Sequence, residues 1–172
     1  MGDDATQLNN RAEKLMQKEQ WAEVVRLIES QPQMLERDDV LSWNLGWAYF
    51  KLGDFKSSQL HLSRAVKLNP KRGASWWALG AVQREDGLLV KAERNVKRAL
   101  RLRDVGHWRA TLALILMQRG KLTEAEQVHL KGLELKPEVS DRWQAYGCFL
   151  EDVGRLSDAE AAYKKARWYR GN

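Results

Sequence analysis

The chain has 172 residues, of which 44% are hydrophobic and 30% are charged, an ordinary composition for a globular protein. The formal net charge is +6, and the whole excess lies in residues 87–172. This asymmetry allows an acidic partner but does not require one. No apolar run approaches 18 residues, so we expect no membrane insertion. Cys148 is the only cysteine, which excludes an internal disulfide and favours a reducing, cytoplasmic location.

A pattern recurs along the chain at steps of 34, 33 and 34 residues. Leu45-Gly46 returns as Leu79-Gly80, then more weakly as Leu112-Ala113 and Tyr146-Gly147. Such a period is typical of stacked helical hairpins. Extending the frame backward adds a degenerate first repeat, so one domain over residues 1–172 is expected to hold five repeats, at approximately 5–38, 39–72, 73–105, 106–139 and 140–172.

Within each repeat after the first, a further glycine separates two segments with helical periodicity: Gly53, Gly87, Gly120 and Gly154. A glycine can take a positive φ and so end the first helix of each hairpin. Thr123 with Glu126, and Ser157 with Glu160, match the capping box that opens a helix. No segment alternates with a period of two, so the pattern predicts ten antiparallel helices and no sheet.

Small residues occupy matching positions in successive repeats. The first repeat has Ala12 where three of the four later repeats have glycine, and its proline, Pro32, comes early. In the later repeats the middle of each first helix is small, at Gly46, Gly80, Ala113 and Gly147. Such residues let a neighbouring helix approach closely, while larger side chains fill the gaps on either side.

These residues resemble the tetratricopeptide repeat family, whose pattern is Trp, Leu-Gly, Tyr, Ala, Phe, Ala and Pro over 34 residues. The third repeat matches it at Trp76, Leu79-Gly80, Ala92 and Ala99. The second repeat matches it at Leu45-Gly46, Tyr49, Ala65 and Pro70. The fifth repeat matches it at Trp143, Gly147, Ala159, Tyr163 and Ala166. The resemblance covers nearly the whole chain and implies an all-α, right-handed superhelical solenoid whose first helices line an inner, concave face. It also implies a non-catalytic protein-interaction scaffold.

The tryptophans fall on different faces of the predicted helices. At about 100° per residue, Trp76, Trp143, Trp21 and Tyr49 lie on the packing side. Trp43, Trp47, Phe50 and Trp77 lie on the face that lines the groove in similar proteins, as do Arg84, Leu114 and Met117. We interpret this second set as the binding site for a peptide segment of another protein, because tryptophan anchors often dominate interfaces. The alternative is that these rings only pack against one another between adjacent helices.

The peptide ligand would place apolar or proline-containing segments against the rings, with Arg84 setting its polarity through a carboxylate. Some members of the resembling family clamp a terminal carboxylate with a Lys, Asn and Arg set. Asn44 occupies a suitable column, but the paired positions hold Trp43 and Trp47. We therefore expect no such clamp.

The stretch VKAERNVKRALRLRD (90–104) is strongly basic. Such a run is usually the solvated outer face of a helix. The alternative function is a scaffold that contacts RNA or an acidic protein through its outer helix faces. The 34-residue frame fits the protein-binding family better, so nucleic acid is the less favoured partner.

An enzyme is the least supported class. His61, His107 and His129 fall in different repeats without metal-ligand spacing. No phosphate loop or nucleophile elbow is present, and Cys148 has no evident catalytic partner. We expect no catalytic residues, no metal and no cofactor.

The last predicted helix carries Trp168 and Tyr169. Repeat arrays usually finish with an extra polar helix that covers the last apolar face. Here the two rings either fold over that end or contact a second copy of the chain. A homo-oligomer through this helix is therefore one expectation.

Overall fold

A computed structural model describes residues 4–171, which form only helices and the turns between them. The helices are α1 (Ala5–Gln17), α2 (Trp21–Glu29), α3 (Pro32–Leu35), α4 (Asp39–Lys51), α5 (Phe55–Leu68), α6 (Gly73–Glu85), α7 (Leu89–Leu102), α8 (Gly106–Gln118), α9 (Leu122–Leu135), α10 (Ser140–Asp152) and α11 (Leu156–Gly171). They belong to two compact units, an N-terminal unit up to Arg103 and a C-terminal unit from Asp104 on.

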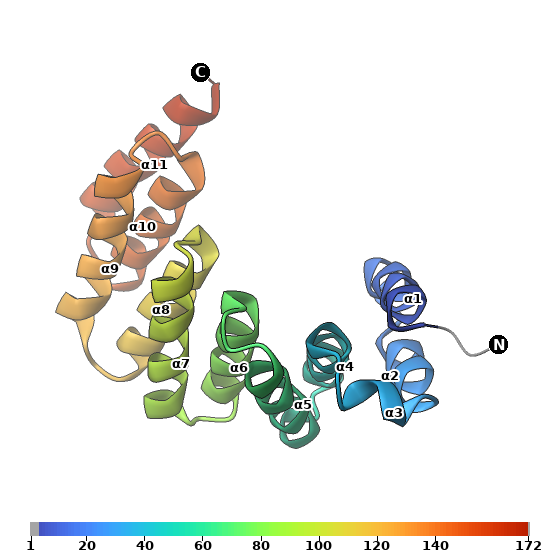
Figure 1. The fold of residues 1–172 in the computed structure, drawn as a ribbon. Helices are drawn as coiled ribbons and strands as arrows, with labels where there is room; N and C mark the ends of the chain where they lie inside the picture. Colours follow the sequence, from blue (N-terminus) through green and yellow to red (C-terminus); the bar gives the residue numbers. More distant parts are fainter. Residues whose placement is uncertain (1–3, 172) are drawn as a thin grey trace. The chain divides into compact units, whose positions relative to one another are not determined.

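The predicted all-α fold of paired antiparallel helices is confirmed. The pairs are α1 with α2, α4 with α5, α6 with α7, α8 with α9, and α10 with α11 (Figure 1). The short helix α3 is additional to the ten predicted, and it begins at Pro32, the early proline of the first repeat. Proline suits the first position of a helix because its missing N–H would have no intrahelical acceptor there. The single domain over residues 1–172 stays a prediction.

Each hairpin turn depends on one residue with a positive φ. Gly53 has a φ of 82°, and Gly87, Gly120 and Gly154 have similar values, as predicted. In the first hairpin the same place, two residues before the second helix, is held by Glu19, whose φ is 56°. A side chain with a Cβ is strained in this conformation. The first repeat therefore keeps the shape of the turn without the residue that suits it.

Replacing Glu19 with glycine should raise the free energy of unfolding by about 1 kcal/mol, because it removes the strain of a left-handed conformation. Urea unfolding followed by circular dichroism measures the change. Glu19→Ala is the matched control, since it removes the same charge but keeps the Cβ. If both variants gain the same stability, backbone strain at this turn is not the cause.

The small residues bring the paired helices close together, as predicted. A Cβ added at Gly80 would lie 2.6 Å from Val96 Cγ2 and 3.0 Å from the carbonyl oxygen of Ala92. A Cβ at Gly46 would lie 2.7 Å from Leu62 Cγ. The hydroxyl of Ser58, from the facing helix, donates a hydrogen bond of 2.7 Å to the carbonyl oxygen of Gly46. These contacts fix α4 on α5 and α6 on α7.

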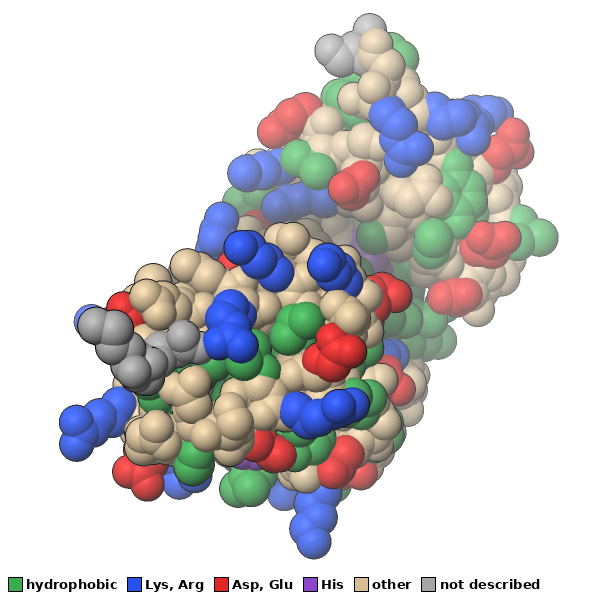
Figure 2. Space-filling model, turned by 90° about the vertical axis from the view of Figure 1, so that its right-hand side faces the viewer, with side chains coloured by type: hydrophobic (Ala, Val, Ile, Leu, Met, Phe, Trp, Pro, Cys, Tyr) green, Lys and Arg blue, Asp and Glu red, His purple; other side chains and the backbone are tan. Residues whose placement is uncertain are grey.

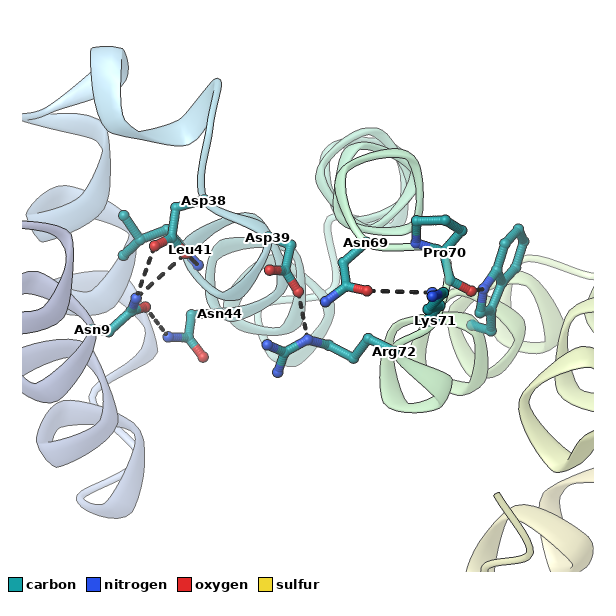
Figure 3. A network of polar contacts seen from close by, with 10 residues as sticks. Asn9, Asp38, Asp39, Leu41, Asn44, Asn69, Pro70, Lys71 and Arg72 are labelled. Atoms are coloured by element: carbon teal, nitrogen blue, oxygen red, sulfur yellow. Dashed lines mark hydrogen bonds and ion pairs between the residues drawn. The ribbon is translucent and has the colours of Figure 1, made fainter. Parts of the chain in front are cut away.

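Polar side chains tie neighbouring hairpins together within the N-terminal unit (Figure 3). The amide of Asn44 in α4 donates to Asn9 of α1 over 3.0 Å. Asp38 caps α4 by accepting from the N–H of Leu41 at 2.8 Å. Arg72, just before α6, is paired with Asp39 at the start of α4. These contacts link the first helices of neighbouring hairpins, α1 to α4 and α4 to α6.

Candidate functional site

Four aromatic rings meet on one side of α4 and α6 in the N-terminal unit, and we call them the aromatic face: Trp43, Trp47, Phe50 and Trp77. The Trp43 and Trp47 rings are stacked, with centroids 5.8 Å apart. Trp47 also lies 5.0 Å from Phe50 and 5.3 Å from Trp77. The centroids are at the distances of favourable aromatic pairs. Trp47 is thus the centre of a cluster that joins the two helices.

The aromatic face is neither fully buried nor fully exposed. All four rings keep part of their surface open to solvent, while their inner sides pack on a core that includes Leu62, Leu79 and Val82. Mutual packing of adjacent first helices, the structural alternative, is therefore present. The remaining exposed surface is what a ligand could cover, because exposed aromatic patches mark interaction sites.

Two side chains adjoin the cluster. Phe55, at the start of α5, lies 6.1 Å from Phe50, and the Lys51 ammonium lies 5.8 Å above the Trp47 ring. The ammonium also lies 5.6 Å above Trp21, so it borders the face with a positive charge. The sequence analysis did not include Phe55 in the site. The available signal was its position, because large apolar residues also begin the second helices α2, α7, α9 and α11.

Arg84 lies on α6, seven residues or about two turns beyond Trp77 on the same side of the helix. Its side chain is 23% exposed and forms an ion pair with the adjacent Glu85. Its Nε is buried and has no hydrogen-bond partner, and the same is true of the Trp43 Nε1. Both atoms are donors, so the region holds hydrogen-bond donors without matching acceptors.

The other predicted site residues lie in the C-terminal unit. Leu114 and Met117 are on α8, where Leu114 is 41% exposed and Met117 is partly buried. On α11 the Trp168 and Tyr169 rings contact each other edge to face at 4.6 Å, and Trp168 is 61% exposed. Trp168 therefore leaves most of its surface in solvent.

Trp76 and Trp143, expected in the core, occupy matching positions in their hairpins but keep part of their surface. The Trp76 indole donates to the carbonyl oxygen of Pro70 at 2.9 Å, and Arg98 lies over its ring. The Trp143 indole donates to the carbonyl oxygen of Pro137 at 2.6 Å, and Lys165 lies over its ring. Both rings thus close the start of a first helix onto the preceding loop.

Asn44, the residue that matched one column of a carboxylate clamp, is 1% exposed and donates to Asn9. Its amide therefore serves a contact between two helices. The expected absence of a carboxylate clamp, which rests on Trp43 and Trp47 at the paired positions, stays a prediction.

Most of the basic stretch lies in α7, and Arg103 follows its last residue. All six cations are exposed: Lys91, Arg94, Lys97, Arg98, Arg101 and Arg103. Lys97 is paired with Glu93 of the same helix, and Arg98 lies over Trp76. The others reach into solvent and give this helix a positive outer face.

The titratable groups of residues 4–171 include no cluster of three or more His, Cys, Asp or Glu side chains that could hold a metal ion. Burial lowers the pKa of His61 and His107, and it lowers the pKa of His129 to about 4, with a smaller contribution from Arg109. Cys148 is exposed. In the same range, no helix has the length and apolar character needed to cross a membrane.

Comparisons with known proteins agree with this architecture. A tetratricopeptide repeat family model matches residues 44–106, which include α5, α6 and most of the aromatic face. A search of curated proteins by sequence found no match.

Solved structures of MamA have a similar fold. One MamA crystal structure aligns with a TM-score of 0.76 at 20% identity, covering 99% of this chain and 94% of that chain. MamA from Desulfovibrio magneticus RS-1 aligns with a TM-score of 0.77 at 18% identity, covering 99% and 97%. The recurring Leu-Gly pairs, the antiparallel hairpins and the family model over residues 44–106 show that the chain contains tetratricopeptide repeats.

Proposed function

We propose that this protein is a non-catalytic interaction scaffold that binds a peptide segment of a partner protein on the aromatic face. Tetratricopeptide repeats typically mediate protein–protein interactions. The observation that supports this site is that four contacting rings on α4 and α6 keep exposed surface, although each also packs on the core. A cytoplasmic location stays a prediction.

The ligand would gain affinity by covering the rings around Trp47 with apolar or proline-containing side chains. Arg84 and Lys51 would orient it, because both carry positive charge beside the rings and can pair with carboxylates or carbonyl oxygens. Leu114 and Met117 remain proposed contacts on α8, and Trp168 with Tyr169 a proposed contact between copies.

The test is partner capture from cell extract by wild type and by Trp43→Ala/Trp77→Ala. Each ring should contribute about 2 kcal/mol, so the double variant should lose capture while its helicity survives. The matched control is Trp76→Ala/Trp143→Ala, which removes two partly buried indoles outside the aromatic face. Equal loss of capture in both variants, or unfolding of the first alone, would show that the rings are structural.

A second candidate function is favoured by α7, whose exposed cations could contact phosphates or acidic side chains. Salt separates the two candidates within the same experiment. Contacts to phosphates weaken steeply as ionic strength rises, whereas aromatic contacts change little. Capture that disappears at high salt but survives the loss of Trp43 and Trp77 would favour α7.

A further inference from the structure

A separate cavity lies on the first hairpin, away from the aromatic face. It has a volume of about 210 Å³ and is lined by Arg11, Lys14, Leu15, Lys18 and Leu27. Small-molecule sites usually measure about 300–1,000 Å³. This cavity is therefore too small for a typical cofactor, and its size suits one large apolar side chain.

The cavity opens on the side of α1 that faces away from α4. Asn9 contacts α4, and at about 100° per residue Arg11, Lys14 and Lys18 lie on the opposite side of the helix. Leu15 and Leu27 form the apolar floor, and both pack with their inner sides on the core around Val24 and Ile28. The cavity thus joins an apolar floor to a solvent-facing rim.

The rim carries only positive charge. Three of the five lining residues are cations, all of them exposed, and none is acidic. Glu13 of α1 lies about 40° from Asn9 around the helix, so its carboxylate belongs to the other side. Figure 2 views the N-terminal helices from outside, where Lys and Arg side chains lie among hydrophobic and acidic ones.

Lys14 and Lys18 also have a structural use, since cations at the C-terminal end of a helix stabilise its dipole. The carbonyl oxygens of Leu15 and Met16 at that end already accept hydrogen bonds from the backbone of the following turn. This structural role of Lys14 and Lys18 needs no apolar floor beside them. A ligand with an apolar centre and acidic flanks would match the apolar floor and the cations together.

We propose that this cavity docks an acidic peptide segment of a partner protein, with one large apolar side chain inserted between Leu15 and Leu27. Carboxylates on either side of that residue pair with Arg11, Lys14 and Lys18. Arg11 and Lys18 are seven positions apart, about 10 Å along the helix, a distance that an extended peptide covers in about three residues. The recognised sequence therefore has an acidic, an apolar and an acidic residue within three or four positions.

The experiment uses the full chain and a fluorescein-labelled acidic peptide with one central leucine, followed by fluorescence anisotropy. A second peptide replaces the leucine with alanine, and a third replaces the acids with their amides. The leucine peptide should bind at least about tenfold more tightly than the alanine peptide, because three buried carbons are lost. The amide peptide should not bind.

The test variant is Lys14→Glu/Lys18→Glu, and it should lose peptide binding. Lys67→Glu/Lys131→Glu changes the net charge by the same amount outside the cavity and should bind like wild type. Circular dichroism of both variants checks that the first hairpin still folds.

Several outcomes would overturn the proposal. Equal binding of the leucine and alanine peptides would reduce the site to a general charge effect, as would equal loss in both variants. Failure of the leucine peptide to bind would exclude the ligand class. Capture by phosphatidylserine vesicles, or self-association of the chain, that depends on Lys14 and Lys18 without peptide binding would assign the cavity to a membrane surface or to a second copy.

Discussion

Replacing Gly80 with leucine will lower the free energy of unfolding by about 3 kcal/mol, at the upper end of the cost of overpacking a core. A Cβ at this position already approaches the carbonyl oxygen of Ala92 to 3.0 Å. A backbone atom cannot turn aside as a side chain can, so α6 must move away from α7. The better helix propensity of leucine, worth about 1 kcal/mol relative to glycine, does not offset this movement. Urea unfolding followed by circular dichroism and tryptophan fluorescence measures the loss.

Two other glycines provide graded controls. At Gly147 the three atoms nearest to an added Cβ all belong to the ring of Tyr163, which can move at the cost of its 2.7 Å hydrogen bond to Glu151. Gly147→Ala should therefore cost about 1 kcal/mol. At Gly106 nothing lies within 4 Å of an added Cβ, so Gly106→Ala should be neutral within about 0.5 kcal/mol. Equal costs at all three positions would contradict the close-packing explanation.

The same small residues explain how much of the fold was predictable. A glycine that must be small and a glycine that must have a positive φ recur at fixed spacing, because every hairpin repeats the same two constraints. Where a repeat satisfies a constraint with a different residue, the pattern weakens. Glu19 takes the turn conformation of Gly53 without being a glycine, and nothing in its residue type indicates this.

The helix starts were predicted less well. Thr123 with Glu126 was expected to cap a helix, but α9 begins at Leu122, and Thr123 lies inside it. Glu126 instead accepts a hydrogen bond from Tyr146 and pairs with Arg155. Ser157 likewise lies inside α11. The capping-box prediction was wrong because Thr123 and Ser157 both lie inside their helices, and Glu160 pairs with Lys164 of its own helix.

For the aromatic face, helical periodicity placed Trp43, Trp47, Phe50 and Trp77 on corresponding sides of two helices. Their mutual contacts follow from that arrangement. The extent of their burial does not, because it depends on how α4, α5 and α6 pack and on the rotamer of each ring. Phe55 joins the cluster from the start of a different helix, which a face-by-face reading of first helices does not include.

A polar cluster in the C-terminal unit lay outside any pattern in the sequence. Asp104 stands where two other repeats have Pro70 and Pro137. Its carboxylate pairs with Arg109 at 2.6 Å and with Arg142 at 3.4 Å. Arg142 also donates to the carbonyl oxygen of Gly132, and Arg109 to that of Val128 at 3.5 Å. One acidic residue therefore holds two arginines that connect α8, α9 and α10.

Asp104→Asn should lower the free energy of unfolding by about 3 kcal/mol at neutral pH, the lower end of the range for breaking a buried ion pair. The Arg109 and Arg142 side chains are only 13% and 9% exposed, so both charges would lose their common counter-ion while remaining largely buried. The Asp104 side chain is 31% exposed, so solvent screening keeps the loss in the free energy of unfolding at the lower end of this range. Glu138→Gln, in the exposed loop between α9 and α10, removes an equal charge and should change stability by less than about 0.5 kcal/mol.

The pH dependence separates the ion pair from a simple packing defect. Burial alone would raise the pKa of Asp104, but the hydrogen bonds and charges of Arg109 and Arg142 outweigh it and hold the pKa below 3.8. The stabilisation is therefore present above the unfolded pKa and lost as pH falls through the lower folded one. The pKa of His129, lowered to about 4 mainly by burial, makes the stability of both proteins fall between about pH 6.5 and 4. The difference between wild type and Asp104→Asn should thus be constant from pH 7 to 5 and shrink below about pH 4; a difference that persists at pH 3 would mean that the carboxylate charge is not what holds the two arginines.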